Sequence, residues 1–421
     1  MSLRSVHSAS LRRPSKGDAL LTTLLTGFFG PVYRIFLKLV GAQPDPSKGK
    51  TDSPSPLSLL LGLSLGLLFL PGCGSESPDP ASVSGTNRLP FSPRTYAIQR
   101  APTPPTIDGR LTETAWAEAD WTAPFVNSQG RNQPSPPFQT RAKMMWDDTY
   151  LYVAAQLEES DVRATFTTRD TSIWRENAFE LFIDPDGDTH NYYEYQINAR
   201  ETQWDLLLTK PYRDAETPRI SAWDIRGLKK GVTVQGTLNE PSDTDEGWTV
   251  ELALPWSVLA ETAPNAQPPQ DGDQWRLNLT RMQWPVTVTD GNYVQDTTDS
   301  GAFAWSPQGG TGNYHKPERW GIVEFSTAPT NAPADTVRVP PNERVKWALR
   351  RLYYRQNAYR EANGTYASSL RALNAADISL ENRTFNPRLQ TTQSSYEITA
   401  SGANGASVHI RHDGKVWTTT E

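Results

Sequence analysis

FQTRAKMMWDDTYLYVAAQL, residues 138–157, is the stretch that decides the fold. Two runs of apolar and aromatic residues flank the polar triplet Asp147-Asp148-Thr149, which is the pattern of a β-hairpin. The pattern recurs in AFELFIDPDGDTHNYYEYQI, residues 178–197, where an acidic segment separates the two runs. The two stretches predict two antiparallel hairpins in the middle of the chain.

The β pattern continues outward from these hairpins over residues 96–325. Further strands are expected at residues 202–209, 232–238, 248–254, 275–283 and 320–325. Helical periodicity is confined there to two short segments, 113–119 and 256–260. Many short strands joined by polar turns predict an all-β domain, an antiparallel β-sandwich over residues 95–326.

The pattern changes after residue 326. Residues 327–341 hold several Pro, Ala and Thr residues and are interpreted as a linker. Glu343 to Ala362 shows helical spacing of apolar residues and is followed by Gly364, a helix-stop signal. Strands are expected at 396–400, 408–411 and 415–419, so residues 342–421 are predicted to form a small α+β unit.

Residues 1–72 are interpreted as a leader that the mature protein lacks. Leu57 to Leu70 is too short to span a bilayer but has the length of a signal-peptide apolar region. Leu70-Pro71-Gly72-Cys73 follows the pattern of a bacterial lipobox. Cys73 is the only cysteine, so it is expected to carry a lipid anchor, with a buried free thiol as the alternative. Residues 73–94 would then be a tether, and the protein would reside in the cell envelope, at the outer membrane or cell surface.

Charge and aromatic content narrow the class of partner. The chain has 41 basic and 47 acidic residues, and the leader carries 8 of the basic and 3 of the acidic ones, so the part that follows it has a net charge of 33 − 44 = −11. An acidic surface repels phosphate backbones, so no nucleic-acid partner is expected. All 14 tryptophans follow the leader. Flat aromatic rings can cover the apolar C–H faces of sugars, while carboxylates, amides and arginines bind the hydroxyls.

The central region resembles the family 9 carbohydrate-binding modules. The resemblance is carried by IDGRLTETAW (107–116), WDDTYLYV (146–153), IWRENAFELFID (173–184), YYEYQIN (192–198), and the segment 305–321 that begins WSP and ends HKPERWG. It implies a β-sandwich of jelly-roll type that binds polysaccharide or oligosaccharide. Members of the family often accompany glycan-degrading enzymes, which are therefore expected partners.

The resemblance also implies that two tryptophans hold a terminal sugar between them. Trp174 and Trp305 match those positions best, and the alternative is that both rings belong to the core. Four other tryptophans fall in strand or helix patterns and are expected to be core: Trp116, Trp146, Trp248 and Trp275.

The candidate polar partners of a sugar are Arg175, Glu176, Glu180 and Asn198. For Arg175 and Glu176 the alternative is a solvated loop. Glu180 shares one face of its strand with Phe182. A buried Phe182 would therefore oblige Glu180 to have a partner, whether a sugar, an arginine or a cation.

Asp184, Asp186 and Asp188 alternate around Gly187, as oxygen ligands do at the start of a Ca²⁺-binding loop. The closing Glu of an EF-hand is missing, so an ordinary acidic turn is the alternative. Relatives in the resembled family use structural Ca²⁺, so this ion is the candidate cofactor, although an acidic turn without metal is the favoured interpretation of these residues.

Catalysis is a second reading of the same acidic residues. A glycoside hydrolase needs two carboxylates across a cleft, and Glu180, Asp184, Glu194 and Asp205 could supply them. No motif assigns their roles, so the chain is interpreted as a binder. A surface interaction protein that binds no sugar is the third possibility. The stretch from Tyr353 to Leu370 resembles the globular part of type IV pilin-like proteins, without the apolar half-helix that packs pilins together.

Overall fold

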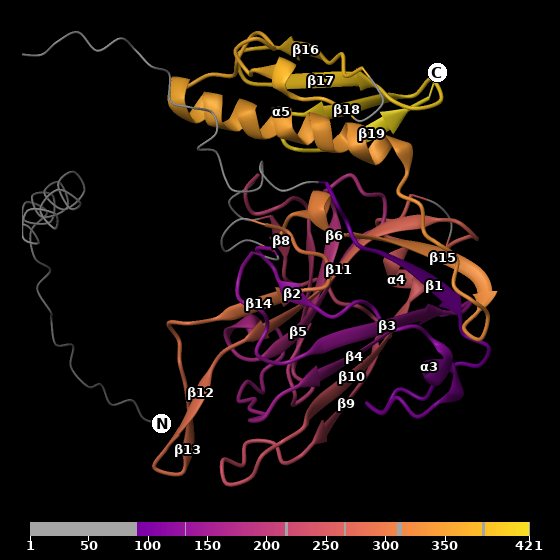
Figure 1. Ribbon diagram of the computed structural model, residues 1–421, viewed down its shortest axis with the longest axis vertical. Helices are drawn as coiled ribbons and strands as arrows, with labels where there is room; N and C mark the ends of the chain where they lie inside the picture. Colours follow the sequence, from indigo (N-terminus) through magenta and orange to yellow (C-terminus); the bar gives the residue numbers. More distant parts are fainter. Residues whose placement is uncertain are drawn as a thin grey trace, which may run out of the picture. The chain divides into compact units, whose positions relative to one another are not determined.

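Both predicted hairpins are present in a computed structural model of the chain (Figure 1). β3 (Thr140–Trp146) pairs with β4 (Tyr150–Glu158), and β5 (Ala178–Asp184) pairs with β6 (Tyr192–Ile197). The structure describes residues 91–130, 132–214, 218–264, 267–309, 314–380 and 384–420. Within these ranges no helix is long and apolar enough to cross a membrane.

The leader, Cys73 and most of the predicted tether lie outside the described residues. Lipid anchoring and the cell-envelope location therefore stay predictions.

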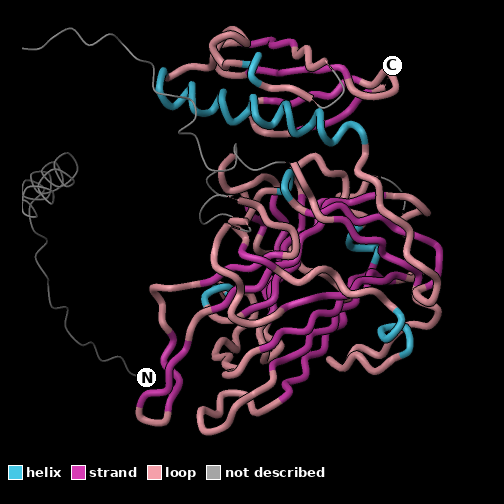
Figure 2. Tube along the Cα trace, viewed as in Figure 1, coloured by secondary structure: helices cyan, strands magenta, loops and turns pink. Residues whose placement is uncertain are grey.

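The remaining elements of the central region are short (Figure 2). The other strands are β1 (Thr95–Arg100), β2 (Val126–Asn127), β7 (Gln203–Leu208), β8 (Arg219–Ile220), β9 (Lys229–Gln235), β10 (Gly247–Pro255), β11 (Gln274–Gln283), β12 (Val286–Thr289), β13 (Asn292–Gln295), β14 (Gly301–Ala304) and β15 (Gly321–Pro329). The helical turns are α3 (Thr114–Glu118), η4 (Ile173–Arg175), α4 (Trp256–Leu259) and η5 (Pro317–Arg319).

Most strands belong to a single sheet that doubles over into a sandwich. Its order is β8-β7-β6-β5-β11-β15-β1-β3-β4-β10-β9, with β14 and β2 attached beside β11. β1 joins the two halves because it pairs with both β15 and β3. These two pairings are parallel and the other pairings in the described sheet are antiparallel. The predicted all-β sandwich is thus confirmed, with β1 as a parallel exception.

The two halves of the sheet enclose the main core. In β5 the odd-numbered side chains Phe179, Leu181 and Ile183 are buried and face alternating side chains of β3, β4 and β10. Trp146, Trp256 and Trp275 pack edge-on with Phe325, with ring centroids 5.1–6.3 Å apart. The four tryptophans expected in the core, those at 116, 146, 248 and 275, are all buried.

The even-numbered residues of β5 point to the opposite face of this sheet. Glu180 lies opposite Gln196 of β6, and Gln196 lies opposite Trp204 of β7. Cross-strand partners point to the same face, so these side chains form one row across three strands. The candidate site lies on this face.

A second compact group of elements follows the sandwich. α5 (Pro341–Asn363) ends at Gly364, whose φ of 73° is left-handed and favours glycine. Its apolar side packs on a four-stranded antiparallel sheet, and that sheet contains one strand that the sequence pattern did not predict, β16 (Arg388–Thr391). The other three strands are β17 (Tyr396–Ser401), β18 (Ser407–Arg411) and β19 (Val416–Thr419).

Contacts as well as the chain join the α+β group to the sandwich, and both belong to one compact unit. Arg276 of β11 pairs with Glu343 of α5 in a buried ion pair. Arg213 pairs with Glu318, which also accepts a hydrogen bond from Tyr354 of α5. The predicted boundary between the two parts is therefore crossed by buried polar contacts.

Candidate functional site

A pocket of about 470 Å³ lies on the outer face of β5, β6 and β7. Trp174 forms part of its wall, and the row Glu180, Gln196 and Trp204 lines it together with Glu194. The other lining residues are Phe182, Tyr212, Arg219, Met282, Ser300, Tyr314 and His315. Its size is in the range of small-ligand sites, and it combines aromatic rings with hydrogen-bonding groups.

The backbone of Trp174 is held by hydrogen bonds on both sides. Its backbone N–H donates to Gln196 Oε1 at 2.9 Å, and its carbonyl accepts from the indole of Trp284 at 2.9 Å. Gln295 of β13 holds the next residue by donating to the carbonyl of Arg175 at 2.8 Å. The ring itself is 37% exposed, which is rare for so large an apolar side chain. The fixed backbone thus places an exposed flat ring where a ligand can reach it.

Two buried carboxyls share the pocket. Phe182 is buried, as the sequence argument for Glu180 required, and the partner of Glu180 is the hydroxyl of Thr280 at 2.5 Å. Glu194 accepts one hydrogen bond from Gln196 Nε2 at 2.6 Å. Burial raises the pKa of Glu180 to about 7. Burial, together with the neighbouring charge of Glu180, raises the pKa of Glu194 to about 8.

Two buried polar atoms in the pocket lining have no hydrogen-bond partner among the described residues. Glu194 Oε2 is an acceptor and the indole Nε1 of Trp204 is a donor. The nearest basic group to Glu194 Oε2 is His315 Nε2 at 3.8 Å. Burial lowers the pKa of His315 to about 3, so this imidazole is neutral at physiological pH. A ligand with hydroxyl or amino groups could satisfy both atoms.

Trp305 does not face Trp174, and the predicted pair of rings is wrong. Trp305 is 1% exposed and packs edge-on against Tyr96 in the main core. A Cβ at Gly321 would lie 2.2 Å from its ring, so the indole fills the space above a glycine. No sugar can reach a ring in that position.

The other predicted contact residues divide in two. Arg175 adjoins the site, with its guanidinium 5.3 Å from the ring centre of Trp174. Glu176 and Asn198 are buried and bind each other at 2.6 Å. Glu176 also accepts from the backbone of Thr165 at 2.8 Å. These two residues support the loop that leads to Trp174, and neither lines the pocket.

The carbohydrate family 9 binding domain-like profile matches residues 107–328, a little over half of the chain. The chain belongs to this family. The resemblance inferred from the sequence is thereby confirmed, and the match covers β2 to β14 and nearly all of β15.

Two curated relatives of this family 9 domain are large enzymes. The chain is 25% identical over 155 residues to the exoglucanase XynX of Acetivibrio thermocellus, and 24% identical over 155 residues to endo-1,4-beta-xylanase A of Thermoanaerobacterium saccharolyticum. Each match covers 37% of this chain but only 12% and 11% of the relatives. Among solved structures, a family 9 carbohydrate-binding module of Caldicellulosiruptor kristjanssonii in complex with cellotriose is 16% identical, with a TM-score of 0.37, over 58% of this chain and 100% of that one.

Gln196, Trp204 and Arg219 are among the pocket-lining residues of the family 9 domain that were not predicted from the sequence. Strand alternation carries the signal for the first two, because Gln196 is two residues after Glu194 and Trp204 lies near the start of the next strand. What was missing was the register between β6 and β7. Arg219 lies in a two-residue strand, where no periodic signal exists.

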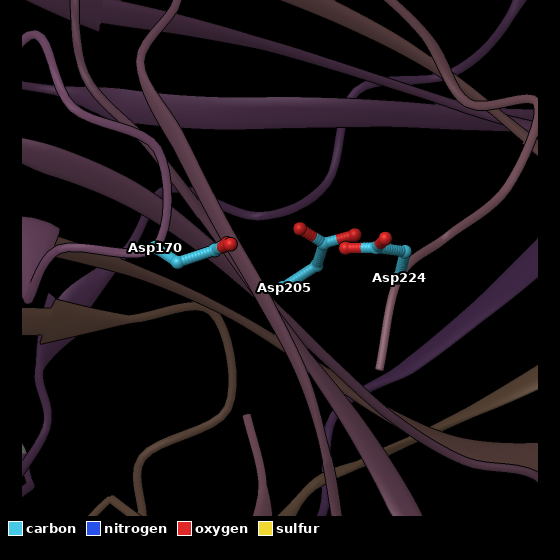
Figure 3. A group of neighbouring side chains, drawn as sticks. All are labelled: Asp170, Asp205 and Asp224. Atoms are coloured by element: carbon cyan, nitrogen blue, oxygen red, sulfur yellow. The ribbon is translucent and has the colours of Figure 1, made fainter. Parts of the chain in front are cut away.

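A group of three aspartates outside the pocket shares one arginine. Asp170, Asp205 and Asp224 bring carboxylate oxygens within 4.8 Å of one another (Figure 3). The guanidinium of Arg169 pairs with all three, at 3.4, 2.6 and 2.6 Å. Asp205 follows Trp204 in β7, so it points away from the pocket and cannot act there with Glu194.

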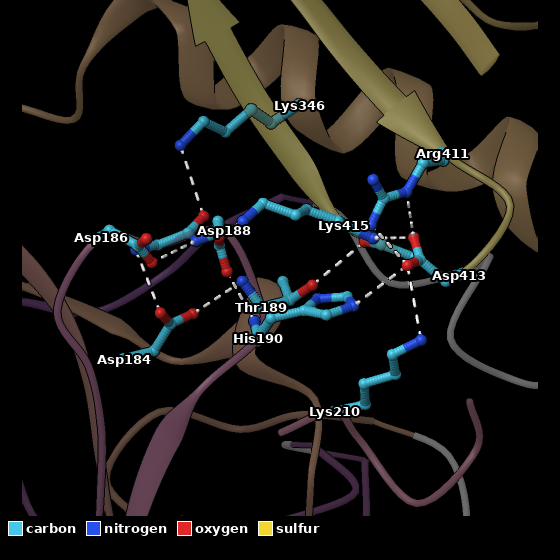
Figure 4. A network of polar contacts seen from close by, with 12 residues as sticks. Asp184, Asp186, Asp188, Thr189, His190, Lys210, Lys346, Arg411, Asp413 and Lys415 are labelled. Atoms are coloured by element: carbon cyan, nitrogen blue, oxygen red, sulfur yellow. Dashed lines mark hydrogen bonds and ion pairs between the residues drawn. The ribbon is translucent and has the colours of Figure 1, made fainter. Parts of the chain in front are cut away.

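The acidic turn between β5 and β6 also brings three carboxylates within 4.8 Å, those of Asp184, Asp186 and Asp188 (Figure 4). Asp184 accepts from the backbone of Gly187 and Thr189, which closes the turn. Burial and the two neighbouring aspartates raise the pKa of Asp184 well above its ordinary value. Oxygen-rich and crowded with negative charge, the donor set fits Ca²⁺. One partial competitor is present, because Lys415 pairs with Asp188 at 2.6 Å.

Proposed function

We propose that the pocket beside Trp174 binds a sugar residue of a polysaccharide or oligosaccharide. The observation that carries the proposal is the exposed indole of Trp174, on a backbone held by Gln196, next to buried polar atoms without a hydrogen-bond partner among the described residues. The ring would cover the apolar face of a pyranose, while Glu194 would accept from a hydroxyl and the Trp204 indole would donate to one. Membership of a family of carbohydrate-binding domains supports this reading.

A single ring replaces the predicted sandwich of two tryptophans. Trp204 lies across the same pocket but is nearly buried, and Arg219 covers its ring at 5.8 Å. Stacking would thus come from Trp174, and the remaining contacts would be directional hydrogen bonds at the floor of the pocket.

Removal of the Trp174 ring tests this function. Stacking on one aromatic ring contributes on the order of 1 kcal/mol or more, so Trp174→Ala should weaken sugar binding about tenfold or worse. Titration calorimetry with cellotriose and with xylan oligosaccharides measures the change, and circular dichroism checks the fold. Trp417→Ala, which removes a half-buried indole from the outer face of β19, is the matched control and should bind normally. Unchanged affinity of Trp174→Ala for every sugar that the wild-type protein binds would place the site elsewhere.

Glycoside hydrolysis is a second candidate function, favoured by one observation. Two carboxyls with raised pKa values, those of Glu180 and Glu194, share the pocket, and a general acid needs such a pKa. Both values are raised together, however, whereas acid and nucleophile require pKa values that differ strongly. We therefore infer binding without turnover. Release of reducing sugar from xylan or cellulose that disappears in Glu180→Gln would overturn this inference.

We further propose that the protein is lipid-anchored at Cys73 in the cell envelope, where it acts beside glycan-degrading enzymes. The apolar run followed by a single cysteine supports the anchor. Mass spectrometry of the native protein should find an N-terminus at Cys73 with added acyl mass, and Cys73→Ser should remain unprocessed. An intact leader on the native protein would contradict the proposal.

A further inference from the structure

Two acidic side chains, Glu180 and Glu194, line the pocket with one arginine, Arg219, so the pocket is negatively charged when both carboxyls ionise. Glu180 and Glu194 are 2% and 3% exposed and interact across adjacent strands. Neither carboxyl forms an ion pair with a lysine or arginine among the described residues. Ionising a buried carboxyl without a paired cation is costly, which raises the pKa of both groups, and a bound cation would favour their ionised forms.

The groups that face Glu194 come from every neighbouring element. Glu180 faces it from β5, Tyr212 and Arg219 from the segment between β7 and the end of β8, and Tyr314 and His315 from the segment before η5. Arg219 is the one permanent cation among these lining residues. It stands over the ring of Trp204 and only partly offsets the two acids.

We infer that the pocket prefers a sugar that carries an amine, such as the glucosamine units of de-N-acetylated chitin oligosaccharides, over the corresponding neutral sugar. The inference rests on the proposed sugar-binding function and specifies its ligand class. An ammonium group has three donors and a positive charge, which matches the unpartnered Glu194 Oε2 and the adjacent Glu180. A uronic acid would bring a third carboxyl into the pocket and is disfavoured by the same electrostatics.

Proton release on binding should distinguish an amino sugar from a neutral sugar. Near pH 6 both carboxyls are mostly protonated, because their pKa values lie at about 7 and 8. An ammonium ligand favours the ionised carboxylate, so its binding must release protons to the buffer. A neutral sugar that binds the protonated carboxyl releases none. Calorimetric heats in two buffers of different ionisation enthalpy separate the two cases.

The experiment compares cellotriose, the glucosamine trisaccharide and its N-acetylated form at pH 6 with the same protein. The amino sugar should bind at least tenfold more tightly than the other two and should release protons. Glu194→Gln should reduce the ratio between amino and neutral sugar to near one, whereas Glu246→Gln, which removes an exposed carboxyl, should keep it. If Glu194→Gln fails to fold by circular dichroism, Glu180→Gln provides the same test.

The outcomes separate the two proposals. Equal affinity for cellotriose and the amino sugar, or tighter binding of a uronic acid oligosaccharide, overturns the inference and leaves sugar binding in place. Failure of every sugar to bind overturns the proposed function as well as the inference. A preference for the amino sugar that persists in both carboxyl variants also overturns the inference, because the ammonium group would then be bound by residues other than Glu180 and Glu194.

Discussion

Glu194 shows how a side chain can be suited to a ligand at the expense of stability. It is buried with one hydrogen bond from Gln196, and its pKa of about 8 lies far above the usual value for a glutamate. Because the folded pKa is raised, the folded protein holds more protons than the unfolded chain between about pH 4.5 and 8. Its contribution to stability is therefore complete below pH 4.5 and is lost as pH rises toward 8.

This sign gives a testable pH dependence. The melting temperature of the wild-type protein should fall as pH rises from 5 to 8, and Glu194→Gln should flatten that slope, since an amide does not ionise. The raised pKa of Glu194 should change the free energy of unfolding by at most a few kcal/mol over this pH range. Thermal melts at half-unit steps measure the effect, with Glu246→Gln as the control that keeps the wild-type slope. A slope unaffected by Glu194→Gln would mean that this carboxyl is ionised and stable in the folded protein.

The two tryptophans that were predicted to bind a sugar differ in the structure, because Trp174 is exposed and Trp305 is buried. Trp174 precedes a strand, and its exposure follows from a loop whose backbone is held by side chains on both sides. Trp305 precedes a similar turn, yet it is buried because Gly321 leaves room for its ring. That contact joins Trp305, just after β14, to Gly321 at the start of β15, and no local pattern reveals which glycine lies beneath which indole.

At the scale of elements, the sequence predicted the two strands of the β5–β6 hairpin but not the contacts that its turn makes. Alternation of apolar residues identified both strands and the face that carries Glu180. The sequence could not show that the acidic turn meets the C-terminal group, where the backbone of Val416 donates to the carbonyl of Asp188 at 3.1 Å. Lys346 also donates to the carbonyl of Gly187 at 3.4 Å.

The acidic turn is the place to test for Ca²⁺, which we propose is held by Asp184, Asp186 and Asp188. A ligand that binds only the folded state stabilises it, by about 2.7 kcal/mol at a concentration one hundred times its dissociation constant. Excess chelator should therefore lower the melting temperature by several degrees. Lys415→Met removes the competing ion pair with Asp188 and should make stability more dependent on Ca²⁺. Unchanged melting with chelator, and no metal by elemental analysis, would leave Lys415 as the cation that the turn uses.

At the scale of the whole molecule, the C-terminal group is coupled to the sandwich through buried charges. Arg276 and Glu343 are 5% and 9% exposed, and the pKa of Glu343 falls to about 2 because Lys346 and Arg276 outweigh the effect of burial. The sequence indicated a linker over residues 327–341 and hence two separable parts. It could not reveal this ion pair, because nothing local to either residue specifies a partner 67 positions away.

This coupling predicts that the sandwich and the C-terminal group unfold together. Calorimetry of residues 74–421 should show a single transition, because separation of the two parts would leave Arg276 or Glu343 without its partner. Glu343→Gln removes one charge of a buried pair and should cost about 3–5 kcal/mol, whereas the double variant Arg276→Met/Glu343→Leu should recover much of that loss. Glu361→Gln, an exposed carboxyl on the same helix, should have almost no effect. Two resolved transitions in the wild-type protein, or additive effects in the double variant, would show that the C-terminal group is attached by its chain alone.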